Sequence, residues 1–517
     1  MNDAQSQEAV LAWLADPATH GGAAVKRVDT HAAVVFLAGS RALKVKRAVR
    51  FPFLDYSTLE KRKQACAAEL RINRPFAAQI YRRVVPITRA PAGELQFDGA
   101  GDPIEWAVEM HRFDENATLD HLAAAGGIDT GLADALGRAV AAAQEAVQGE
   151  ARESVEPARW IKALADYIEE HVVAFGEMPD LFPPPQIDAL ACASRAAHAR
   201  VQALLHERSE RGLIRRIHGD LHLGNVVLLD GRPVLFDAIE FSALIATGDL
   251  LYDLAFLLMD LAERGLRGAA NIVLNRYLLE TKRVLDLDAL AALPLFLSMR
   301  AAIRAKVTAA RLRFAAAQDR GAIETSARKY FDFACRAIVP APPVLVAVGG
   351  LSGTGKSVLA RALAPALDPA PGAVVLRSDI ERKALFTAGE FEKLPEHAYT
   401  DAVNARVFAT LGDKARRALA AGHSAIVDAV FSKPQERALI EQSAAALGIP
   451  CFGLFLQADI ATRIARVGRR GHDASDADAA IAHKQESYDL GTLAWRRIDA
   501  SGTPDETLVR ARAALPG

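Results

Sequence analysis

The chain contains few cysteines, and they do not form groups. The four cysteines lie far apart, with no C-x-x-C pair and no zinc-type spacing to histidine: Cys66, Cys192, Cys335 and Cys451. This pattern excludes a disulfide-stabilised small protein and a cysteine-ligated zinc site. Reduced thiols are typical of the cytoplasm, so we expect a cytoplasmic protein.

Net charge and long apolar runs are also lacking. The formal net charge of −1 gives no reason to expect a nucleic-acid partner or an anionic membrane surface. The most apolar window, 250–261, is interrupted by Asp253 and Asp260 and falls short of the ~20 apolar residues that span a bilayer. The N-terminal segment has neither the basic region nor the apolar run of a secretory signal. We therefore expect neither a nucleic-acid nor a membrane partner.

Length and proline content predict how the chain divides. With 517 residues it exceeds a single hydrophobic core, so we expect two or three domains. The proline-rich segment 339–343 cannot continue a helix and is typical of a short, stiff linker. We predict a boundary there, between a domain at 1–338 and a domain at 344–517.

The stretch 218–241, HGDLHLGNVVLLDGRPVLFDAIEF, has the layout of a phosphoryl-transfer loop. Asp220 can accept the proton of an attacking hydroxyl, and Asn225 and Asp237 can hold Mg²⁺ on nucleotide phosphates. Asp230-Gly231 lies between two short apolar runs, which predicts a hairpin that brings Asn225 close to Asp237.

This stretch, completed by Glu240, resembles the aminoglycoside-phosphotransferase family. The resemblance implies a bilobal, protein-kinase-like fold for 1–338, with a small lobe to about residue 113, a helical lobe over about 114–338, and ATP as the nucleotide. It also implies a phosphate-gripping lysine on the third strand. Lys44 and Lys46 would face the same side of that strand, and the resemblance favours Lys44. The glycine-rich loop of protein kinases is missing at 29–31.

A helix predicted over 58–76 begins at Ser57 or Thr58 as its cap. Glu69 lies on its apolar side and is the candidate partner that orients Lys44, with Glu60 and Glu94 as weaker competitors. The helix start at 247–255 resembles the same family, and we interpret its carboxylates as structural.

A second site follows the linker. The apolar run 344–348 leads into GGLSGTGKS at 349–357, which is G-x-x-x-x-G-K-S in its required strand–loop–helix context. Backbone N–H groups of such a loop curl around phosphates, Lys356 would reach the β and γ oxygens, and Ser357 would hold Mg²⁺. The predicted loop residues are Gly350, Gly353, Thr354 and Gly355.

The remaining residues alternate between strand and helix, which predicts a parallel α/β sheet with ligands at the carboxyl ends of its strands. The predicted strands are 373–376, 424–427, 450–456 and 493–498. Asp379 and Asp428 follow two of these strands; Asp379 can meet an acceptor hydroxyl, and Asp428 stands where a Walker B carboxylate would. Which aspartate is the base and which belongs to the metal shell stays open.

Residues 344–517 resemble the gluconate-kinase, zeta-toxin and chloramphenicol-phosphotransferase group of P-loop kinases. After the phosphate loop, the segment RSD-x-x-R-K at 377–383 is the most specific part of this likeness. The resemblance implies a lid that closes over the phosphates, and Arg466 and Arg470 are its candidate nucleotide-binding arginines.

The sequence thus predicts an ATP- and Mg²⁺-dependent phosphotransferase with two nucleotide sites. The expected acceptor is a hydroxyl on a small molecule, such as a sugar or an amino sugar. Two alternatives remain: one domain, foremost the P-loop domain, is a regulatory nucleotide switch, or it acts on a protein or nucleotide-sugar target.

Overall fold

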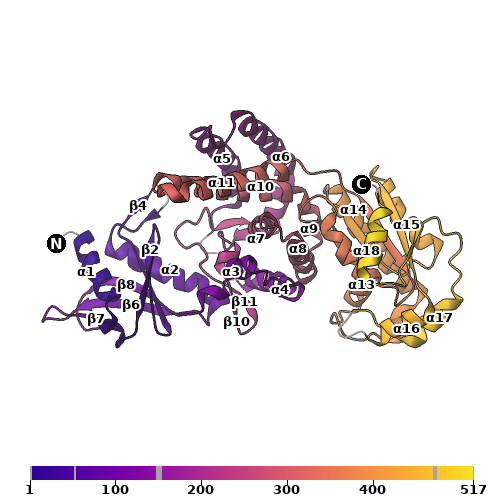
Figure 1. Ribbon diagram of the computed structural model, residues 1–517, viewed down its shortest axis with the longest axis horizontal. Helices are drawn as coiled ribbons and strands as arrows, with labels where there is room; N and C mark the ends of the chain where they lie inside the picture. Colours follow the sequence, from indigo (N-terminus) through magenta and orange to yellow (C-terminus); the bar gives the residue numbers. More distant parts are fainter. Residues whose placement is uncertain (1–2, 52–53, 147–153, 470–473, 516–517) are drawn as a thin grey trace. The chain divides into compact units, whose positions relative to one another are not determined.

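The computed structural model describes residues 3–51, 54–146, 154–469 and 474–515 (Figure 1). The chain packs as two compact units, the first formed by 1–167 with 202–260 and the second by 168–201 with 261–517. The predicted linker at 339–343 contains neither helix nor strand. The domain boundary placed there stays a prediction, since packing divides the chain at other positions.

The first unit begins with an antiparallel sheet of six strands. In spatial order these are β1 (Val25–Asp29), β2 (Ala33–Ala38), β3 (Arg41–Lys46), β8 (Pro103–His111), β6 (Tyr81–Arg89) and β7 (Leu95–Phe97). A separate pair consists of β4 (Arg50–Phe51) and β5 (Leu54–Asp55).

Two helices cover the opposite faces of this sheet, and strand alternation decides which residues meet which helix. Leu43 and Val45 of β3 pack with α1 (Asp3–Ala15) in one core cluster. Cys66 of α2 (Leu59–Ala77) packs on the other face, against β6 and β8. Thr58 caps α2, because its side chain accepts a hydrogen bond from the Lys61 N–H. The even-numbered residues of β3, including both lysines, therefore face α2.

The predicted hairpin is confirmed in the first unit. Strand β10 (Val226–Leu229) pairs antiparallel with β11 (Arg232–Leu235). Asp230 and Gly231 have φ values of 47° and 74°, the left-handed pair that a tight two-residue turn requires. A short antiparallel pair, β9 (Ile214–Arg216) with β12 (Thr247–Asp249), flanks the loop at 218–225.

The region after residue 114 is mainly helical, as predicted. Helices α5 and α6 run through both units, and α7 ends just past the first. The helices are α3 (Leu119–Ala124), α4 (Thr130–Ala146), α5 (Pro157–Gly176), α6 (Pro184–Glu210), α7 (Leu250–Glu263), α8 (Arg267–Thr281), α9 (Val284–Asp288), α10 (Leu293–Ala310) and α11 (Ala317–Ala337).

The second unit contains the predicted parallel sheet. Its five strands are, in spatial order, β14 (Val374–Arg377), β15 (Ala425–Asp428), β13 (Leu345–Gly350), β16 (Cys451–Gln457) and β17 (Arg496–Asp499). Strands β14, β15 and β16 agree with the prediction within a residue at each end, and β13 ends two residues later than the predicted run 344–348. The last begins three residues later than predicted, where its pairing with β16 starts.

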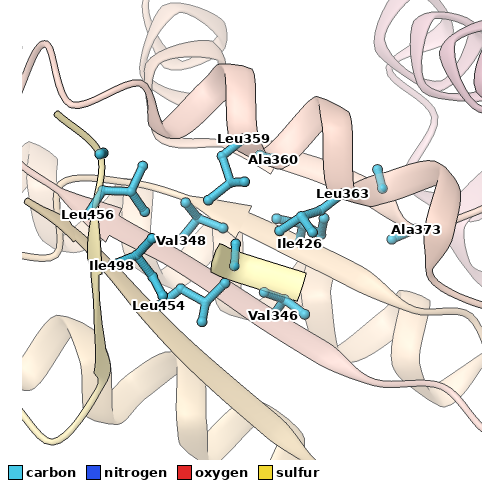
Figure 2. Close-up of a cluster of buried hydrophobic side chains, with 13 residues drawn as sticks. Val346, Val348, Leu359, Ala360, Leu363, Ala373, Ile426, Leu454, Leu456 and Ile498 are labelled. Atoms are coloured by element: carbon cyan, nitrogen blue, oxygen red, sulfur yellow. The ribbon is translucent and has the colours of Figure 1, made fainter. Parts of the chain in front are cut away.

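Figure 2 shows the core of this sheet, in which Val346 and Val348 of the central strand meet Leu359 of the helix that follows the glycine-rich loop. The helices around the sheet are α12 (Lys356–Leu363), α13 (Ser378–Leu385), α14 (Asp401–Ala420), α15 (Pro434–Ala445), α16 (Ile460–Gly468), α17 (Ala479–Lys484) and α18 (Pro504–Ala513). Within the described residues, no helix is both long and apolar enough to cross a membrane.

Candidate active sites

The loop before β10 brings together two of the predicted site residues. The Asn225 amide donates hydrogen bonds to the backbone oxygen of Asp220 (2.9 Å) and to its Oδ2 (3.1 Å). The Asn225 backbone oxygen accepts from the Phe236 N–H (2.9 Å), next to Asp237 in the chain. Asp220, Asn225 and Asp237 therefore lie around one point of the fold.

Two buried carboxylates of α7 hold this loop; sequence reasoning interpreted Asp253 as structural first and assigned no role to Asp260. Asp253 accepts hydrogen bonds from the backbone N–H groups of His218 (3.1 Å) and Gly219 (3.0 Å). Asp260 accepts one from the Leu223 N–H (3.0 Å). The signal was present in the sequence, since both aspartates interrupt the most apolar stretch of the chain. Their buried charges are stabilised by the loop that they position.

Lys44 lies between its predicted partner Glu69 and the predicted metal ligand Asp237. Its Nζ is 2.9 Å from Glu69 Oε1 and 2.6 Å from Asp237 Oδ1. Glu69 is fully buried on α2. Of its two predicted competitors, Glu60 accepts a hydrogen bond from Gln64 on the exposed side of the same helix, and Glu94 lies in the exposed turn between β6 and β7. The geometry favours Glu69 as the partner of Lys44.

Lys46 faces the same way but has a different second partner. Its Nζ lies 2.5 Å from Glu69 Oε2 and 2.5 Å from Glu240 Oε1, and the Tyr56 hydroxyl donates to the same Glu240 oxygen (2.7 Å). Lys44 alone of the two lysines contacts the predicted metal ligand Asp237, which favours Lys44 for the phosphate role.

Electrostatics keep this cluster charged. Burial alone would lower the pKa of Lys44, but the carboxylates of Asp237 and Glu69 outweigh it and hold that pKa well above its ordinary value. Burial likewise opposes the charged form of Glu69, and the two lysines nevertheless hold its pKa below the usual range. The charges therefore depend on one another for their stability.

In the second unit, the glycine-rich loop follows the central strand. Gly350, Gly353 and Gly355 have φ values of 141°, 88° and 92°, a region in which side chains are strained. At Gly353 a Cβ atom would also lie 2.5 Å from the backbone oxygen of Arg463. The buried Thr354 donates to the Leu351 backbone oxygen (2.8 Å). The loop thus has the curl that presents backbone N–H groups to an anion.

The residues beside the loop form a polar set. The Ser357 hydroxyl donates to Asp428 Oδ2 (2.5 Å), and Arg377 donates to both Ser357 Oγ (3.1 Å) and Asp428 Oδ2 (3.3 Å). The Lys356 ammonium donates to the Leu351 backbone oxygen (3.2 Å), across the loop. Asp428 therefore accompanies the predicted Mg²⁺ ligand Ser357, as a Walker B carboxylate would.

Asp379 lies at the start of α13 and faces a cavity of about 290 Å³ that Lys356 and Ser357 also line. Burial raises the pKa of Asp379, and the nearby Asp428 carboxylate adds to the effect, while Arg377 and Lys356 oppose it. A carboxylate with a raised pKa beside a phosphate loop is suited to accept a proton.

Of the two predicted lid arginines, the structure describes Arg466. Arg466 lines the same cavity, and its guanidinium donates to the backbone oxygens of Ala500 (2.7 Å) and Gly502 (2.6 Å). Arg470 lies outside the described residues. The neighbouring Arg463 is buried and donates to the Ser352 backbone oxygen (2.9 Å), so it fastens α16 to the phosphate loop.

Comparison with known proteins places the chain in a family. A model described as "Phosphotransferase enzyme family" matches residues 33–293, about half of the chain. The chain belongs to this family. A second model, described as "AAA domain", matches residues 345–488. The predicted combination of a kinase-like domain with a P-loop kinase domain is confirmed, and the protein is a nucleotide-binding kinase.

The chain is also similar to curated relatives and to solved structures. The chain is 29% identical, over 93% of its length and 94% of theirs, to "Uncharacterized protein Rv2004c" of Mycobacterium tuberculosis and "Uncharacterized protein Mb2027c" of Mycobacterium bovis. A choline/ethanolamine kinase family protein from Mesorhizobium loti matches with 15% identity and a TM-score of 0.39, over 64% of this chain and 94% of its own. A gluconokinase from Sinorhizobium meliloti matches with 22% identity and a TM-score of 0.25, over 34% and 91%.

Proposed function

We propose that the protein transfers the γ-phosphoryl group of ATP, with Mg²⁺, to a hydroxyl of a small molecule, and that it has two nucleotide sites. The observation that carries this proposal is the repetition of one set of groups. Each site has a lysine, a pair of oxygen ligands beside it, and a further aspartate. These are the groups that phosphoryl transfer requires for phosphate binding, metal binding and proton acceptance.

In the first site, Lys44 holds the phosphates and Glu69 orients it. Asp220 accepts the proton of the acceptor hydroxyl, and its hydrogen bond from Asn225 fixes the carboxylate in place. Asp237 contacts Lys44 and would also bind the Mg²⁺ ion. This double contact is consistent with the assignment, because the lysine and the ion would bind the same phosphates.

In the second site, we assign Asp379 as the base and Asp428 to the metal shell. Asp428 bonds directly to Ser357, whereas Asp379 lines the cavity two residues after the carboxyl end of the neighbouring strand β14. This arrangement also favours catalysis over the regulatory-switch alternative, since a nucleotide switch has no need of a second carboxylate that lines the cavity beside the phosphate loop.

The donor sets fit Mg²⁺. This ion prefers oxygen ligands and is typically held by one or two protein groups, with water and substrate phosphates completing its shell. Asn225 with Asp237, and Ser357 with Asp428, supply such partial sets. No cluster of three or more His, Cys, Asp or Glu able to hold a metal occurs in the described part of the chain. When bound, the ion would neutralise charge on the transferred phosphoryl group.

The domain organisation and the location belong to the same proposal. We assign the first site to a kinase-like domain at 1–338, the second to a P-loop domain at 344–517, and the segment 339–343 to a linker. All four cysteines are free thiols, which supports a cytoplasmic location.

Transfer from radiolabelled ATP to a panel of sugars, amino sugars and nucleosides tests the proposal. The variants Asp220→Asn and Asp379→Asn each silence one site and act as controls for each other. We expect each variant to lose transfer to its own acceptor and to keep transfer to the other. If Asp379→Asn retains every transfer of the unaltered chain, the P-loop domain is a switch and not a kinase.

A further inference from the structure

Two asparagines of α8 bond to the exposed edge of the P-loop sheet. Asn275 donates from Nδ2 to the Ala373 backbone oxygen (3.1 Å), and its Oδ1 accepts from the Val375 N–H (2.7 Å). Asn271 donates to the same Ala373 oxygen (3.0 Å). Strand β14 is the first of the sheet, so these backbone groups point away from its neighbour β15. One amide side chain thus pairs with the strand edge as another strand would.

The approach of α8 is close. Gly372 precedes β14 with φ 124°, and a Cβ atom there would lie 2.8 Å from Asn271 Nδ2 and 2.4 Å from the Ala364 backbone oxygen. Asn271 is only 2% exposed. A side chain at position 372 would collide with both atoms, so the close contact of α8 with the start of β14 requires glycine there.

Ion pairs extend the contact to a second segment. Arg276 of α8 lies 2.8 Å from Glu390, and the two side chains are 11% and 20% exposed. The segment that contains Glu390 is also bonded to α13, the helix on which Asp379 lies: Lys383 of α13 donates to the Glu392 backbone oxygen (2.8 Å). Further along the segment, the Leu394 N–H donates to Asp476 (3.0 Å). On the next helix, Asp288 pairs with Arg417 (2.7 Å).

The strand that α8 holds leads directly into the P-loop site. Arg377 ends β14 and bonds to Ser357 and Asp428, and Asp379 follows two residues later. A shift of β14 would therefore move both the arginine and the proton acceptor. Misplacement of a reacting group by about 1 Å can cost roughly 10²-fold in rate.

We propose that Asn275 and Arg276 are positioning residues of the P-loop site, supplied by a helix that precedes the proline-rich linker. The inference rests on the proposed kinase function of that site. Helix α8 holds β14 and the segment around Glu390, and through them Arg377 and Asp379. The sequence segment 344–517 alone lacks this support, and its sheet would end in an uncovered edge.

The test uses the full-length chain with Asp220→Asn, so that turnover of Mg·ATP reports on the P-loop site. Into it are placed Asn275→Ala, Arg276→Ala and the conservative Arg276→Lys. Gln442→Ala and Arg320→Ala, exposed positions on α15 and α11 of the same compact unit, are matched controls. Amide hydrogen exchange is measured over 373–377, 386–395 and 350–357, and kcat and KM for Mg·ATP are determined separately.

For Asn275→Ala and Arg276→Ala we expect faster exchange over 373–377 and 386–395, with exchange over 350–357 unchanged. We expect kcat to fall about tenfold or more, within the range for a misplaced reacting group. We expect KM for Mg·ATP to change less than twofold, since the phosphate loop follows β13 and not the strand β14 that α8 holds. Arg276→Lys should recover most of kcat, and the controls should match the parent.

Three results would overturn the inference. Unchanged exchange over 373–377 would show that α8 does not hold the strand. Faster exchange with an unchanged kcat would make the contact structural only. A parallel loss of kcat, Mg·ATP binding and protection over 350–357 would indicate general unfolding. If the Asp220→Asn parent itself turns over no Mg·ATP, the proposed function of the P-loop site fails, while the exchange data still decide whether α8 holds β14.

Discussion

The two proposed nucleotide sites are built from different kinds of groups. The first places buried carboxylates beside its lysines: Glu69 lies within hydrogen-bonding distance of both Lys44 and Lys46, and Glu240 within that distance of Lys46. The second relies on a backbone loop whose glycines adopt positive φ values and whose residues 352–357 line a cavity of about 290 Å³. One site depends on charge balance, and the other depends on the shape of the main chain.

This difference determines where each site is vulnerable. Removing one partner of a buried ion pair leaves a desolvated charge, which typically costs about 3–5 kcal/mol. In the backbone loop, a single charge matters less for folding than a single Cβ, because Gly353 already lies against the backbone of Arg463. Charge substitutions should therefore destabilise the first unit, and phosphate-loop substitutions should affect nucleotide binding by the second.

The largest effect is expected at Asp220. Asp220→Asn keeps the side-chain volume and its hydrogen bond from Asn225 but removes the proton acceptor, so transfer by the first site should fall by about 10²–10⁴. Nucleotide binding should be retained, since Lys44 and Asp237 are untouched. Single-turnover transfer and calorimetric titration with an ATP analogue measure the two quantities. Full transfer by this variant, with Asp379→Asn present to silence the second site, would remove the assignment.

A second effect tests the charge balance itself. Glu69→Gln leaves Lys44 with Asp237 and Lys46 with Glu240 as remaining carboxylates, so we expect the free energy of unfolding of the first unit to fall by about 3 kcal/mol, the lower end for a broken buried pair. Denaturant unfolding, monitored by hydrogen exchange over α2, measures this free energy of unfolding.

Glu60→Gln, on the exposed side of the same helix, is the matched control and should change stability by less than about 0.5 kcal/mol. Equal effects of the two substitutions would contradict the charge-balance description. Selective loss with Glu60→Gln would identify Glu60 as the partner of the lysine.

Sequence reasoning succeeded where the required residues are close in the chain. The loop at 218–237 and the phosphate loop at 350–357 are each defined by local spacing, and the Asp230-Gly231 turn and the strand–loop–helix order followed from local rules. The parallel sheet was predictable for the same reason, because apolar runs alternate with helical periods at short intervals.

What could not be predicted depends on contacts between distant residues. Period-two alternation places Lys44 and Lys46 on one face, and only the positions of Asp237 and Glu240, over 190 residues later, distinguish them. The role of Asp253 in holding the loop at 218–225 likewise required the packing of α7, since an aspartate near a helix start already has an explanation as a cap. The contact of α8 with β14 joins residues about 100 positions apart and has no motif.

A third effect compares nucleotide binding. Lys356→Ala removes a charge-assisted contact to the phosphates, a type of bond worth about 1.5–3 kcal/mol, so affinity at the P-loop site should fall by roughly 10- to 100-fold. Calorimetry on the full chain should then show one site weakened and the other unchanged. A change in both would show that the sites are coupled, and couplings between sites typically amount to about 1–3 kcal/mol.

The smallest effect concerns pH and the second site alone. Burial, together with Asp428, raises the pKa of Asp379. Because the carboxylate must be deprotonated to accept a proton, kcat/KM should decline as the pH falls, at a pH above the ~3.9 of an ordinary aspartate.

The free energy of unfolding should change with pH in the opposite direction to kcat/KM. A pKa that is higher in the folded than in the unfolded protein stabilises the folded protein at low pH, and this stabilisation is lost as the pH rises through the folded-state pKa. Titration of Asp379 therefore cannot unfold the site in acid. We expect the Asp220→Asn chain to show this acid limb while circular dichroism stays constant, and Asp379→Asn to abolish it together with most of the remaining activity. An acid limb at or below the ordinary aspartate range would assign the base to another group.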